Sequence, residues 1–119
     1  MINKLTYDET IAAVADHYGY DSQSRQLVEE MAELTSAINH FWRKELQCGK
    51  LDPSALNIGP AYDHILEELG DVVICVDQLI YLLHGETEVR SHMKDKLKRQ
   101  CERAGISYGR TKRTVHDLS

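Results

Sequence analysis

Two short segments of the chain, "EEMAE" and "EELGD", each hold two carboxylates three residues apart: Glu30 with Glu33, and Glu68 with Asp71. Residues three apart on a helix lie on the same face, so each pair would present both carboxylates on one side. Converging carboxylates repel each other unless a cation lies between them. Because Mg²⁺ prefers oxygen ligands, the spacing predicts a Mg²⁺ site, with Mn²⁺ as the alternative ion, held by these four residues.

The ordinary interpretation of a single ExxE motif is a solvated helix face. Two such pairs, each opening an apolar helix, are less easily explained in that way. Other sites are disfavoured by the sequence: no glutamate has a histidine three residues later, as helical di-iron sites require, and no GxxxxGK[ST] loop is present.

The elements that must position these residues are four helices, and no strand-like alternation competes with them. A capping box at Thr6 and Glu9 predicts a first helix that Gly19 ends. A second helix is expected to begin at Ser22 or Ser24. Its apolar stripe has helical spacing and consists of Leu27, Met31, Leu34, Ile38, Phe41 and Trp42.

After a loop over 48–60, a third helix is expected from Ala61 to His84 and a fourth from Thr87 to Ala104, the latter ended by Gly105. The third helix is apolar nearly all round in its second half, so it needs cover on more than one side. A second subunit would supply part of that cover. We therefore expect an all-α bundle of four to five helices that forms a homodimer or homotetramer.

Each carboxylate pair flanks an apolar stripe on a helical wheel. The stripe of the third helix consists of Leu69, Val73 and Val76. Packing this stripe against that of the second helix would bring both pairs to the same edge of the interface. Gly70, beside the second pair, would permit a close approach of the helices there.

The composition indicates one domain over residues 1–119, in which 105–119 form a short basic tail. A net charge of −5 argues against nucleic acid as a partner, since phosphate backbones select for an excess of Lys and Arg. Three cysteines without a CxxC pair suit a reducing compartment. No apolar run approaches membrane-spanning length, so we expect a cytoplasmic protein without a membrane partner.

The Glu30-x-x-Glu33 and Glu68-x-x-Asp71 pairs, the second within "EELGDV", resemble the ExxE…ExxD motif of the all-α nucleoside triphosphate pyrophosphohydrolases. That superfamily includes MazG, the dimeric dUTPases and phosphoribosyl-ATP pyrophosphohydrolase. The resemblance covers roughly 26–103. One departure is the separation of 34 residues between the two pairs, which is longer than in most of the family. The extra length falls in the loop over 48–60.

The resemblance implies a MazG-like fold and Mg²⁺-dependent hydrolysis of a nucleoside triphosphate to the monophosphate and pyrophosphate. In that framework Glu30 would act in catalysis as well as in metal binding, and Glu29 is a candidate base that orients the attacking water. Lys96 and Arg99, three apart, match the family's basic positions and would bind phosphate. Trp42, the sole tryptophan, is a candidate for stacking on the base, although such a residue is more often part of a core.

Two alternatives remain open on the sequence. One is a helical interaction protein that has lost turnover. The other is a member of the same superfamily that acts on a different substrate, such as phosphoribosyl-ATP. The base, the sugar and the number of metal ions are not specified by these motifs.

Overall fold

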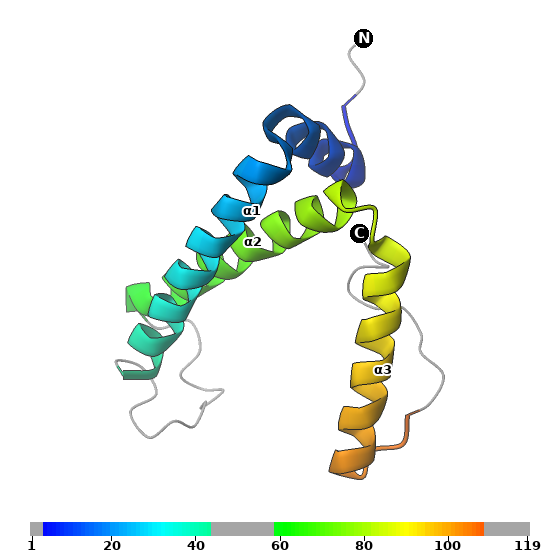
Figure 1. Ribbon diagram of the computed structural model, residues 1–119. Helices are drawn as coiled ribbons and strands as arrows, with labels where there is room; N and C mark the ends of the chain where they lie inside the picture. The colour runs from blue at the N-terminus through cyan, green and yellow to red at the C-terminus, as the bar shows by residue number, and fades with distance from the viewer. Residues whose placement is uncertain (1–3, 44–58, 109–119) are drawn as a thin grey trace.

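The computed structural model describes residues 4–43 and 59–108, and its ribbon is shown in Figure 1. In these residues the chain forms three helices, α1 (Tyr7–Phe41), α2 (Gly59–Leu82) and α3 (Glu86–Ala104). The described residues contain no strand. The all-α class predicted from the sequence is therefore confirmed.

Two features expected from the sequence lie largely outside the described residues. They are the loop over 48–60 and the basic tail over 105–119. The fourth expected helix corresponds to α3. It ends at Gly105 as predicted, with the backbone in the left-handed conformation (φ 71°, ψ 24°) that glycine favours.

The capping box that opens α1 is formed as the sequence predicted. The Thr6 hydroxyl accepts a hydrogen bond from the Glu9 backbone N–H at 3.1 Å, and a Glu9 carboxylate oxygen accepts one from the Thr6 N–H at 2.9 Å. The hydrogen bond from the Thr6 backbone is the largest of the effects that lower the pKa of Glu9. These contacts satisfy N–H groups that a helix start otherwise leaves without partners.

The expected count of four to five helices is wrong for the described residues. Gly19 does interrupt the helix, with φ 83° and ψ 168°, a conformation open essentially to glycine alone. However, the chain is helical again immediately after Gly19, and no linker separates the two helical segments. The first and second expected helices are therefore two arms of α1, joined by a kink that is visible in Figure 1.

The second arm of α1 lies along α2 (Figure 1), and polar side chains join the two helices. Gln23 Nε2 donates a buried hydrogen bond to Gln78 Oε1 at 2.7 Å. The Tyr81 hydroxyl donates to the Asp16 carboxylate at 2.7 Å, and this hydrogen bond is the main cause that raises the pKa of Tyr81. The register of the helix pair is thus set by hydrogen bonds as well as by apolar contact.

A third polar contact lies near the start of α1. The Tyr7 hydroxyl donates to the Asp77 carboxylate of α2 at 2.7 Å. Burial and the Asp77 carboxylate together raise the pKa of Tyr7 to about 12. The hydroxyl therefore remains a donor throughout the physiological pH range.

The faces that α1 and α2 turn toward each other match the expected stripes only in part. On α1, Met31 and Ile38 are exposed, whereas Leu27, Leu34 and Phe41 of the same stripe are half-buried. Leu69 and Val73 on α2 are 42% and 45% exposed, so their stripe lies outside the interface. Gly70 approaches no neighbour, because a Cβ at that position would meet nothing within 4 Å. The buried residues of α2 are Ala61, Glu68, Cys75 and Gln78, and those of the second arm of α1 are Gln23 and Ala37. The fully buried residues of the contact are thus small or polar, and its larger apolar side chains are only half-buried.

α3 stands away from most of the α1/α2 pair and meets it mainly at the end of α2 (Figure 1). The turn between them runs through His84, which adopts a left-handed φ of 53°, and its backbone hydrogen bonds return to the last turn of α2. No residue of α3 is buried, and Met93 and Leu97 are about half exposed. The apolar surface of α2, which the sequence predicted to be buried on more than one side, is thus not covered by α3 of the same chain.

None of the described helices is sufficiently long and apolar to cross a lipid bilayer.

The buried Gln23–Gln78 hydrogen bond gives a test of this packing. Gln78→Ala should lower the free energy of unfolding by about 1–3 kcal/mol, since it leaves a buried amide without its partner. Replacing both residues by leucine should cost much less than the two single losses together. Urea unfolding of the single and double variants measures this, and a double variant as unstable as the sum would contradict the packing.

Candidate metal centre

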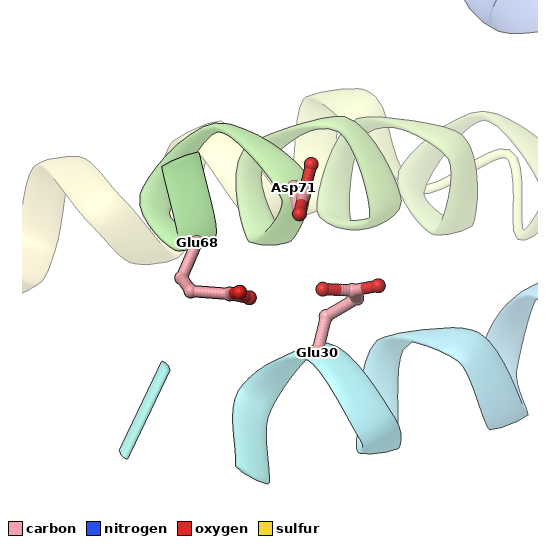
Figure 2. Close-up of side chains that lie close together, drawn as sticks. All are labelled: Glu30, Glu68 and Asp71. Atoms are coloured by element: carbon pink, nitrogen blue, oxygen red, sulfur yellow. The ribbon is translucent and has the colours of Figure 1, made fainter. Parts of the chain in front are cut away.

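Three carboxylates meet where α1 and α2 face each other. Glu30 comes from α1, whereas Glu68 and Asp71 come from α2, and one oxygen of each lies within 4.8 Å of those of the others. Figure 2 shows Glu30 and Glu68 reaching toward each other from the two helices, with Asp71 further along α2. Glu68 is only 6% exposed, Glu30 is half-buried and Asp71 is exposed. The cluster therefore opens to solvent on the Asp71 side.

Two oxygens at the centre of this cluster lack a hydrogen-bond partner. Both Glu30 Oε2 and Glu68 Oε2 are buried and accept no hydrogen bond. Their other oxygens are contacted by the residue one turn earlier on the same helix. Gln26 Nε2 donates to Glu30 Oε1 at 2.7 Å, and His64 Nε2 lies 3.8 Å from Glu68 Oε1. Buried polar atoms normally have partners, so these two oxygens are the atoms of the site that are available to bind a ligand.

Burial is the main cause that raises the pKa of Glu68, and the negative charge of Glu33 is the next. Glu30 and Asp71 raise this pKa further, whereas His64 lowers it. The direction matches that expected for carboxylates that crowd together without a cation among them. Ionisation of Glu68 is thus less favourable than that of an ordinary glutamate.

Cys75 lies one turn beyond Asp71 and is buried, as the sequence predicted. Burial and the charges of Glu30 and Asp71 raise the pKa of its thiol. The thiolate is the form that binds metals, and these surroundings disfavour it. Cys75 therefore acts as a small apolar side chain beneath the carboxylates.

The donor set of this cluster fits a hard divalent cation. Mg²⁺ and Mn²⁺ select carboxylate oxygens, and an ion between Glu30 and Glu68 would satisfy both open oxygens. α2 carries five carboxylates and no Lys or Arg, and on α1 the lone cation, Arg25, contacts Asp21 at 3.3 Å. Neither helix of the pair therefore brings a Lys or Arg to the cluster, and His64 of α2 is cationic there only when it is protonated.

The structure brings together three of the four carboxylates predicted to bind metal. The fourth, Glu33, is exposed and lies outside the group whose oxygens approach within 4.8 Å, although it is close enough to raise the pKa of Glu68. Glu29, the candidate base, is also exposed. Whether Glu33 turns toward an ion remains a prediction from the sequence.

The remaining predicted site residues lie away from the cluster. Lys96 and Arg99 are exposed on α3, where Lys96 borders a shallow hollow together with His92, Met93 and Leu97. Trp42 caps the end of α1 and is 50% exposed. Its neighbour Phe41 contacts Tyr62 of α2, with ring centroids 6.1 Å apart.

Gln26 and His64 were not predicted from the sequence as parts of the site. Both are placed there by helical geometry, because each precedes a cluster carboxylate by four residues. A donor four residues before each central glutamate is a signal that the sequence does contain. It becomes informative only after the buried oxygens identify which glutamates are central.

The chain matches no protein-family model, no curated protein and no solved structure. Its function must therefore be argued from the site itself and from the two carboxylate motifs.

The raised pKa of Glu68 predicts how the stability of the metal-free protein depends on pH. At about pH 4, near the ordinary glutamate pKa, Glu68→Gln and the wild type should be similarly stable, whereas towards about pH 8 the ionised wild type should become less stable than the variant. The sign follows because the folded protein holds the Glu68 proton more tightly than the unfolded chain does. Urea unfolding across this pH range measures the difference.

Glu67→Gln is the matched control, because it removes a neighbouring charge that is exposed and outside the cluster. It should show no such trend. If Glu68→Gln is instead much less stable than the wild type at every pH, Glu68 takes part in an attractive pair and the repulsive cluster is incorrect.

Proposed function

We propose that this protein is a MazG-like enzyme that uses Mg²⁺ to hydrolyse (deoxy)nucleoside triphosphates to the monophosphate and pyrophosphate. Removal of unwanted nucleotides from the pool would be its role. The observation that carries the proposal is the cluster of Glu30, Glu68 and Asp71 with two buried oxygens that accept no hydrogen bond. The two carboxylate motifs that supply these residues are those of the pyrophosphohydrolases they resemble.

In this proposal Glu30, Glu68 and Asp71 hold the ion, and Glu33 joins them from one turn further along α1. A divalent cation bound there supplies neutralisation of phosphate charge and lowers the pKa of an attacking water. Glu29 is exposed on α1 and precedes Glu30 in the sequence. In this proposal it would orient that water and accept its proton. The open side at Asp71 admits the triphosphate, whose transfer chemistry depends on positioning and charge neutralisation.

The phosphates also need cationic side chains, and α3 carries them. Its second half, 94–103, has five Lys or Arg residues and two carboxylates, whereas α1 and α2 together have twelve carboxylates and one Arg. Since α3 stands away from the cluster of its own chain, Lys96 and Arg99 would reach the site of a second copy. Such a dimer would also cover the open apolar faces around Val73 on α2 and Leu97 on α3.

Two rival functions use the same fold. A non-catalytic interaction protein would have no need for buried carboxylate oxygens without partners, which are costly in the absence of an ion. A superfamily relative acting on phosphoribosyl-ATP would use the same cluster with a different pocket wall. A panel of nucleotides that includes phosphoribosyl-ATP separates these possibilities.

The bond that breaks tests the proposed reaction. With Mg²⁺ and a nucleoside triphosphate, the primary products should be the monophosphate and pyrophosphate, separated by anion-exchange chromatography. EDTA should abolish the reaction, and Mg²⁺ or Mn²⁺ should restore it. Glu68→Gln should lower turnover by at least ~100-fold, since it removes a ligand of the ion that stabilises the transition state.

Glu67→Gln serves as the control here too and should keep near-normal turnover. Release of orthophosphate and a diphosphate as primary products would contradict the proposed reaction. Turnover that persists in EDTA would contradict the role of the metal.

The proposed assembly predicts that catalysis can be restored by mixing two inactive chains. Light scattering should give at least twice the chain mass of 13.6 kDa. Glu68→Gln chains and Lys96→Ala/Arg99→Ala chains should each be inactive alone. When the two are co-expressed, about half of the dimers should be mixed, and each mixed dimer has intact carboxylates opposite an intact α3 in one of its two sites. About a quarter of wild-type activity should therefore return.

No recovery in the mixture, from variants that still dimerise, would mean that the cations act within their own chain. A strictly monomeric mass at micromolar concentration would contradict the dimer itself. Val73→Asp, on the open face of α2, should shift the protein toward monomer, because it places a charge where the second copy packs.

A further inference from the structure

Each of the two central glutamates of the cluster has a polar side chain one turn earlier on its own helix, but the two contacts differ. Each has one oxygen contacted by the side chain four residues earlier, Gln26 for Glu30 and His64 for Glu68, and each leaves Oε2 buried without a partner. The Gln26 contact is a hydrogen bond of 2.7 Å. The His64 contact, at 3.8 Å, is longer than a hydrogen bond.

We propose that Gln26 is a positioning residue for the metal centre. By donating to Glu30 Oε1, its amide directs Glu30 Oε2 toward Glu68 and Asp71 and makes Glu30 a single-oxygen ligand. This inference rests on the proposed metal site, but it assigns to Gln26 a role that the carboxylate motifs do not contain.

The chemistry of the contact specifies its direction. An ionised carboxylate only accepts hydrogen bonds, so the atom of Gln26 that faces Glu30 must be the amide nitrogen. The Gln26 amide nitrogen therefore occupies Glu30 Oε1, and the amide oxygen of Gln26 could not take its place, because two acceptors do not form a hydrogen bond. Oε2 is the atom that remains for an ion.

A neutral donor is well suited to this position. Without the metal, repulsion from Glu68 and Asp71 would turn the flexible Glu30 side chain out toward solvent. A Lys or Arg in place of Gln26 would hold the carboxylate but would also neutralise the charge that attracts the ion. The Gln26 amide opposes the outward rotation and leaves the full negative charge for the metal. Hydrogen-bond partners of metal ligands commonly change metal affinity by about 10–100-fold when removed.

The test is a titration of the metal-free full-length protein with Mn²⁺, in which free Mn²⁺ is followed by its paramagnetic resonance signal. Gln26→Met keeps the length of the side chain and removes the donor. We expect it to weaken Mn²⁺ binding by about 10–100-fold while the melting temperature of the metal-free protein stays unchanged. Gln100→Met, an exposed glutamine on α3, is the matched control and should bind Mn²⁺ as the wild type does.

The outcomes separate this inference from the proposed reaction. If the wild type binds Mn²⁺ and Gln26→Met binds it equally tightly, the positioning role is overturned while the metal centre stands. If the wild type binds no Mn²⁺ at millimolar concentration, both are overturned. If Gln26→Met binds more weakly but the wild type hydrolyses no nucleotide, the positioning role is supported and the proposed reaction is overturned.

Discussion

The structure depends on one unusual contact, the burial of the Glu68 carboxylate between α1 and α2. A buried carboxylate is costly unless a cation or several donors meet it, and here one of its oxygens meets neither. The helix pair is held in register around it by hydrogen bonds between neutral or partly exposed groups, such as Gln23 with Gln78 and Tyr81 with Asp16. These contacts fix the separation of α1 and α2 without placing a positive charge beside the carboxylates.

This arrangement leaves little apolar material inside the chain. The buried apolar side chains of the described residues are Ile11, Ala15, Ala37, Ala61 and Cys75, most of them small. Small side chains let two helices approach closely, but they bury little surface, and buried apolar area is the main source of folding free energy. Meanwhile Leu69 and Val73 remain nearly half exposed on the other face of α2. The polar site and the open apolar face are thus two consequences of the same helix orientation.

The sequence predicted those features that depend on local chemistry. The cap at Thr6, the break at Gly19 and the end of α3 at Gly105 are each specified by one residue type and its neighbours, and all three occur where expected. The meeting of Glu30 with Glu68 and Asp71 was also anticipated, although it was expected from packing of the Leu69 stripe against α1, which does not occur. What failed was the rotation of the helices about their axes. α2 has two apolar faces, and hydrophobicity alone pointed to the Leu69 face, whereas the contact uses the face that carries Glu68 and Cys75.

A carboxylate cluster of this kind has three physical remedies: protonation, an ion pair or a bound metal ion. Protonation of Glu68 neutralises one of three charges and leaves Glu30 and Asp71 still facing each other. An ion pair within α1 and α2 has only one source, His64, which is 3.8 Å from Glu68 Oε1, is cationic only when protonated and does not reach the buried Oε2 atoms. α2 lacks Lys and Arg, and Arg25 on α1 lies against Asp21. A divalent ion neutralises two charges and can be coordinated by Glu30 Oε2 and Glu68 Oε2 at the same time. It also agrees with the neutral Gln26 amide beside Glu30, since a cluster meant to be neutralised by the protein itself would be expected to carry a cation there.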